Sequence, residues 1–126
     1  MTPQNLATTL FHMSEQDGYI LLRRQLPELT PDSQSQLIEL LKREADQRWS
    51  DETPRSYIIA GHLLSLGDIT RNRYAHALGL MTRGESLRRM GRDAESIEYL
   101  DAAGEEFLSV SDEAGWARTR IGRVSA

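Results

Sequence analysis

Three histidines are the side chains in this sequence best suited to metal binding or acid–base chemistry: His12, His62 and His76. They are separated by 50 and 14 residues, and none belongs to a recognisable metal-binding motif with a second histidine or a carboxylate. His62 and His76 are expected on helices that can be neighbours, so a two-histidine pocket in a small enzyme or ligand-binding bundle stays open. Ordinary surface or half-buried histidines account for the pattern more simply.

The other residue types that support catalysis are absent or unfavourably spaced. The adjacent carboxylates Asp51–Glu52 and Glu105–Glu106 project about 100° apart on a helix, so they do not form a shared acid–base pair. The nine glycines occur singly rather than in a phosphate-binding loop, and there is no Gly-x-Ser-x-Gly elbow. The chain has no cysteine, which excludes disulfides, thiolate metal sites and a cysteine nucleophile. We therefore predict a protein that is not an enzyme and has no cofactor and no metal site.

Composition narrows the class of protein further. The 126 residues are 39% hydrophobic and carry a net charge of −4, which fits one folded domain, residues 1–126, with no basic excess for nucleic acid. Residues 1–68 hold 6 basic and 10 acidic side chains, and residues 69–126 hold nine of each. No run of apolar residues is long enough to span a membrane, and no secretory leader is recognisable. The sequence therefore predicts a soluble, cytoplasmic protein that binds neither nucleic acid nor membrane.

The elements that position these side chains are predicted to be helices throughout. Leu, Ala, Glu and Arg are abundant, and no Asn-Gly or Asp-Gly turn joins alternating apolar runs. Thr2 and Ser14 are expected N-caps, and Thr30-Pro31 and Thr53-Pro54 are two further start signals of the same kind. Gly67 is the expected end of one helix, and Asp93 is the expected cap of another. The predicted helices cover about 3–12, 19–25, 31–49, 54–67, 69–90, 94–108 and 114–124. Short loops between them predict antiparallel helical hairpins.

A specific spacing of small and large residues lies in the second half of the chain. Its members are Gly84, Leu87, Gly91, Ser96, Leu100, Ala103 and Gly122. Gly84 and Ala103 allow two helices to approach closely, and Gly91 allows a tight turn with positive φ. The spacing resembles the tetratricopeptide repeat, a helix-turn-helix unit of about 34 residues. Gly122 follows Gly84 by 38 residues, as in bacterial arrays with a longer period.

The resemblance implies an all-α fold in which helical hairpins stack as a short right-handed solenoid. It covers residues 57–126 as repeat-like helices, leaves 1–56 as divergent N-terminal helices, and suggests a fragment of a longer array. Such arrays belong to larger bacterial regulatory or signalling proteins. The implied function is a non-catalytic scaffold that binds a peptide or partner protein.

In repeats of this type the first helices of successive hairpins line a groove. The resemblance places two sets of residues there: Met81, Glu85 and Arg88 from one helix, and Trp116, Thr119, Arg120 and Arg123 from the next. Arginines beside a tryptophan suit an acidic peptide, because guanidinium groups bind carboxylates through paired hydrogen bonds. The alternative is a solvated arginine face with Trp116 in the core.

The last helix suggests a second function. Trp116, Ala117, Ile121 and Val124 need a covering helix, and a terminal cap, a longer array or a second copy of the chain would each satisfy them. The alternative to a peptide-binding scaffold is therefore a self-associating helical domain that forms a homo-oligomer through its last helix.

Overall fold

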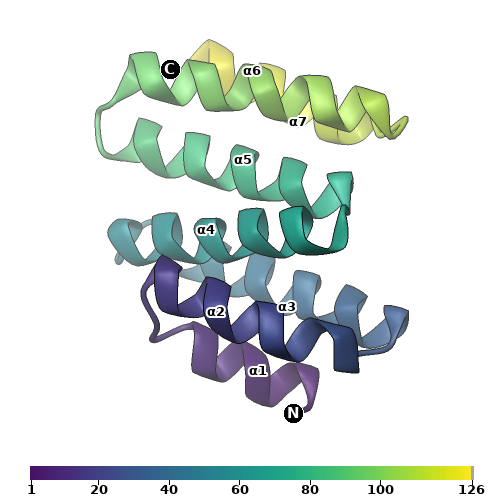
Figure 1. The fold of residues 1–126 in the computed structure, drawn as a ribbon. Helices are drawn as coiled ribbons and strands as arrows, with labels where there is room; N and C mark the ends of the chain where they lie inside the picture. The colour runs from purple at the N-terminus through teal and green to yellow at the C-terminus, as the bar shows by residue number, and fades with distance from the viewer. Residues whose placement is uncertain (126) are drawn as a thin grey trace.

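The computed structural model describes residues 1–125, and these residues form helices and connecting turns with no strand. Figure 1 shows the helices stacked in chain order from the N-terminal to the C-terminal end. The elements are α1 Pro3–Leu10, α2 Glu15–Gln25, the 3-10 turn η1 Leu26–Glu28, α3 Pro31–Arg48, α4 Thr53–Thr70, α5 Arg73–Arg89, α6 Asp93–Ser109 and α7 Glu113–Ser125. The predicted all-α class is confirmed. No helix in the described part is both long and apolar enough to cross a membrane.

Side-chain caps fix the beginnings of several helices. The hydroxyls of Thr2, Ser14 and Thr30 each accept a hydrogen bond from the backbone N–H three residues later, at 3.1 Å. The Asn72 side chain does the same at the start of α5, at 3.0 Å. Each cap satisfies an amide that has no partner within its helix. The predicted caps at Thr2, Ser14 and Thr30 are confirmed, and Asn72 is an additional one. The start signal at Thr53-Pro54 gives no side-chain cap, because Thr53 is the first residue of α4.

Two predicted boundaries around α4 and α5 are wrong. Gly67 lies inside α4, where the absence of a side chain lets the backbone of His76 on α5 approach closely. The helix ends instead at Thr70 and is followed by Arg71, which takes the left-handed conformation with φ 55°, and α5 begins at Arg73 rather than near Ile69. The predicted start of α6 is also wrong by one residue. Asp93 is the first residue of α6 and makes no capping bond.

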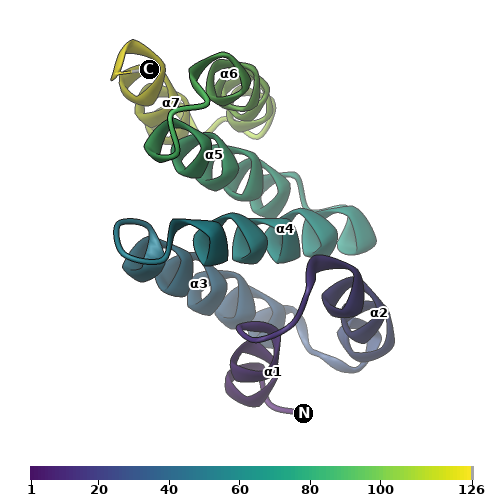
Figure 2. The same ribbon diagram turned by 90° about the vertical axis from the view of Figure 1, so that its left-hand side faces the viewer.

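From α3 onward, helices that are consecutive in the sequence are also neighbours in space. The largest contacts join α4 to α5 and α5 to α6, followed by α6 with α7 and α3 with α4. At the N-terminal end, α1 packs on α3 and α2 packs on α4 (Figure 2). α3 and α5 also touch directly, so these two helices border one surface of the stack. That surface holds the site described below.

The hairpin of α5 and α6 has the close contact that the glycine spacing predicts. A Cβ atom on Gly84 would lie 2.8 Å from Cγ of Leu100, closer than real side chains pack. The Ser96 hydroxyl donates a 2.7 Å hydrogen bond to the Gly84 carbonyl across the same contact. Gly91 has φ +80° in the turn between the helices. Gly84 and Gly91 therefore have the structural roles that the spacing predicts.

Candidate interaction groove

Two of the residues predicted to line a groove are in the core. Met81 is 1% exposed and Thr119 is 0% exposed. The Thr119 hydroxyl donates to the Trp116 carbonyl at 2.6 Å within α7. Both positions face a neighbouring helix, so neither side chain is accessible to a partner.

Two of the predicted α7 residues instead attach α7 to α6. Arg120 Nη1 and Arg123 Nε lie 3.2 Å and 2.9 Å from the same oxygen of Asp101. Arg120 also donates to the Leu100 carbonyl at 3.3 Å, and its guanidinium carbon lies 5.8 Å from the centre of the Trp116 ring. Trp116 is 38% exposed, so it is not a core residue either. The expected groove between α5 and α7 is therefore not the arrangement that these arginines make.

A cavity lies between α3 and α5. It has a volume of about 680 Å³ and is open to solvent along the helices. Ile38 and Leu78 form a nearly buried apolar base, and Tyr74, which is 45% exposed, stands at the edge. The remaining lining residues are polar: Ser35, Glu39, Lys42, Arg43, Asp46, Gln47 and Asn72. A cavity of this size, with an apolar base and a polar rim, has the properties of a binding site for a side chain or short segment.

Lys42, the only lysine in the chain, joins the two walls of this cavity. Its ammonium lies 2.8 Å from Asp46 on α3 and 3.7 Å from Glu85 on α5, and it donates to the Thr82 hydroxyl at 3.0 Å. The Lys42 side chain is only 12% exposed. Because one cation serves two carboxylates, it neutralises much of the negative charge in the cavity while holding α3 against α5.

A smaller cavity of about 270 Å³ continues from Asp46 toward the ends of the same helices. Trp49 is its aromatic wall, and the Trp49 indole N–H donates to the Glu85 carbonyl at 3.0 Å. The guanidinium carbons of Arg88 and Arg89 lie 5.7 Å and 5.3 Å from the Trp49 ring centre. The lining is completed by Thr82, Glu85, Arg88 and, from α7, Arg118. We refer to these two adjacent cavities, which share Asp46 as a lining residue, together as the α3–α5 groove.

The α3–α5 groove contains arginines that are not paired with a carboxylate of the described residues and can bind an anionic group. Its carboxylates are Glu39, Asp46 and Glu85, and its cations are Lys42, Arg43, Arg88 and Arg118. Within residues 1–125, no carboxylate forms an ion pair with Arg43, Arg88 or Arg118. The Nε atom of Arg88 is also buried without a hydrogen-bond partner there. An anionic group that enters the groove can therefore accept hydrogen bonds from the exposed guanidinium groups of Arg43 and Arg118.

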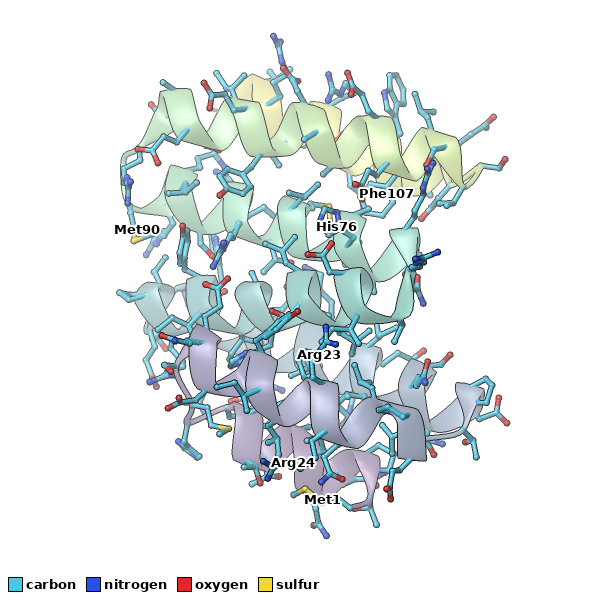
Figure 3. The ribbon with its side chains drawn as sticks, viewed as in Figure 1. Met1, Arg23, Arg24, His76, Met90 and Phe107 are labelled. Carbon is cyan, nitrogen blue, oxygen red and sulfur yellow. The ribbon has the colours of Figure 1, made fainter. Side chains whose placement is uncertain are left out.

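The structure places the histidines in separate surroundings. His76 on α5 faces Glu106 on α6, with Nδ1 2.8 Å from both carboxylate oxygens, and Figure 3 shows its side chain between the two helices. His62 on α4 is 0% exposed and packs on Gly18 of α2. The two rings therefore contact different elements and do not form the two-histidine pocket. In the described part of the chain, no three metal-ligating side chains come together.

Of the residues that the sequence places in a groove, Glu85 and Arg88 line the α3–α5 groove. The repeat spacing does not point to the α3 wall, because it begins at Gly84. The main residues missed are Ile38, Lys42, Asp46, Trp49, Tyr74 and Leu78. A usable signal exists, since Lys42 and Trp49 lie on one side of the amphipathic helix α3, next to Ile38 at the edge of its buried face.

Comparison with known proteins adds no assignment: no protein-family model, no curated protein and no solved structure matches this chain.

Proposed function

We propose that this chain is a non-catalytic protein-interaction module that binds an acidic peptide segment of a partner protein in the α3–α5 groove. The proposal keeps the tetratricopeptide-type interpretation of the fold, with helical hairpins stacked as a short solenoid. It also keeps the expected setting, a cytoplasmic part of a larger bacterial regulatory or signalling protein. The supporting observations are the size of the groove, its lining and its charges.

The single observation that carries the proposal is an apolar cavity whose rim has arginines without carboxylate partners. Ile38 and Leu78 offer an apolar base for a side chain of the peptide. Arg43 and Arg118 line the two cavities, and within residues 1–125 neither guanidinium pairs with a carboxylate. Guanidinium groups bind carboxylates in paired, charge-assisted hydrogen bonds. An acidic segment with one apolar side chain therefore fits the groove.

The proposal is tested with a random peptide library displayed on phage and selected on the purified chain. The enriched sequences are synthesised with a fluorescent label and titrated with the chain by fluorescence anisotropy. We expect enrichment of acidic residues, and we expect Arg43→Glu and Arg118→Glu each to weaken binding about 10-fold, the effect of about 1.4 kcal/mol.

The matched control is Arg24→Glu, which makes the same charge change at an exposed position on α2, away from the groove (Figure 3). Arg24→Glu should leave the affinity unchanged. Enriched peptides without acidic residues, or equal affinity for all three variants, would contradict the proposed function.

A second function, self-association through α7, is favoured by one observation. The exposed residues Ala114, Ala117, Ile121 and Val124 follow the three- and four-residue spacing of a coiled-coil seam, and Val124 is 86% exposed. Sedimentation velocity at several concentrations decides it. A dimer that Val124→Glu dissociates would support self-association, and a monomer at every concentration would remove it.

A further inference from the structure

The first two helices are attached to the rest of the stack by small contacts. α1 packs on α3 and α2 packs on α4, through fewer neighbouring residues than join α4, α5 and α6. Figure 2 shows α1 and α2 at the opposite end of the molecule from α6 and α7. A small interface of this kind can open without unfolding the remaining helices.

A buried histidine lies in the contact between α2 and α4. His62 is 0% exposed, and its ring lies so close to Gly18 that a methyl group at that position would overlap it. Neither ring nitrogen of His62 has a hydrogen-bond partner of good geometry in the described part of the chain. A neutral imidazole can be buried in this way at moderate cost, whereas a charged imidazolium is far more costly.

The charged groups around His62 do not offset the cost of burying a charged imidazolium. Glu15 of α2 is the carboxylate that acts on the ring, and it is already paired with Arg83 of α5. Arg55 of α4 is a cation that also acts on the ring, and it donates to the Met13 carbonyl at 3.3 Å. A positive charge on the ring would therefore repel Arg55 and compete with Arg83 for Glu15.

The balance of these effects favours the neutral ring. Burial lowers the pKa of His62 from its ordinary value of 6.5, and Arg55 lowers it further. The nearby backbone carbonyls of Leu10 and Met13 and the carboxylate of Glu15 oppose this effect without cancelling it. Docking of α2 therefore favours the neutral ring, and the ring regains an ordinary pKa once water reaches it.

We propose that His62 is a pH-sensitive latch whose protonation releases α2 from α4 and, with it, α1 from α3. The undocked state binds the proton more tightly, so acid favours it. Docking is most stable above about pH 6.5, and its equilibrium constant falls up to about tenfold per pH unit as the pH falls toward the pKa of the docked ring. Because α1 supports α3, release also removes support from one wall of the α3–α5 groove. The latch itself does not depend on what the groove binds.

The test is amide hydrogen exchange of the whole chain at about pH 7.5, 6.5 and 5.5, with each rate normalised to the intrinsic rate at the same pH. We expect the protection of α1 and α2 to fall up to about tenfold from pH 6.5 to 5.5, while α5 and α6 keep theirs. His62→Gln should remove this pH dependence, because glutamine carries no titrating group. His12→Gln, at an exposed position next to α1, should keep it.

A second measurement covers the case in which His62→Gln does not fold. The ring signals of His62 in the unmodified chain are followed by NMR over the same pH range. The proposal expects His62 to titrate below its ordinary value and together with the loss of protection in α1 and α2. An ordinary titration while both helices stay protected would overturn it, as would an unchanged pH dependence in His62→Gln.

Discussion

At the scale of single residues, glycines set how closely neighbouring helices approach each other. Gly84 brings α5 against Leu100 of α6, and the carbonyl it exposes is satisfied by the Ser96 hydroxyl. The spacing of these residues predicts this contact, because small residues at these separations let two antiparallel helices approach closely. Gly67 has a similar role against the backbone of His76, although its position in the sequence predicts a helix end. A glycine alone does not distinguish the two roles, since both need the absence of a Cβ atom.

Replacing Gly84 with leucine should disrupt the α5–α6 hairpin. The first added atom already lies 2.8 Å from Leu100, so the two helices must separate, which costs about 1–3 kcal/mol. Urea denaturation measures the loss in the free energy of unfolding. Ala94→Leu makes a similar change at an exposed position in the first turn of α6 and should be nearly neutral. If Gly84→Leu kept the stability of the unmodified chain, the close approach at Gly84 would be wrong.

At the scale of elements, most helices could be predicted and one joint could not. The N-caps at Thr2, Ser14 and Thr30 follow from local chemistry, so they are visible in the sequence. The turn between α4 and α5 depends on Arg71 in a left-handed conformation, which local rules assign to glycine or asparagine. Tertiary packing of α4 on α5 overrides that preference.

On α7, one arginine has a structural role and another lines the groove. Arg120 pairs with Asp101 and donates to the Leu100 carbonyl, so Arg120→Glu should repel Asp101 and lower the free energy of unfolding by up to about 1 kcal/mol. Arg118 lines the groove and has no carboxylate partner among residues 1–125. Arg118→Glu should therefore weaken peptide binding while keeping the stability.

Urea denaturation and fluorescence anisotropy, applied to both variants, test this separation. Arg120→Glu should reduce stability and leave the affinity of the folded chain for the selected peptide unchanged. The reverse result, with binding lost in Arg120→Glu and kept in Arg118→Glu, would contradict the α3–α5 groove. It would favour the α7 face that the repeat spacing suggests.

At the scale of the whole molecule, the groove is formed by helices that are not adjacent in the chain. α3 and α5 meet because both pack on α4, and Lys42 then joins the two across 40 residues. The repeat spacing is visible only from Gly84 onward, so it directs attention to a groove between α5 and α7. Glu85 and Arg88 are common to both alternatives because they lie on α5, the helix that the two grooves share.

The most direct test of the proposed function is a chemical-shift map of the isotope-labelled chain titrated with the tightest peptide from the selection. We predict that the largest changes fall on the amides of α3 and α5 around Ile38, Lys42, Leu78 and Glu85, with small changes in α2 and on the exposed side of α7. Changes concentrated around Ala117 and Val124 on α7, with none along α3, would contradict it.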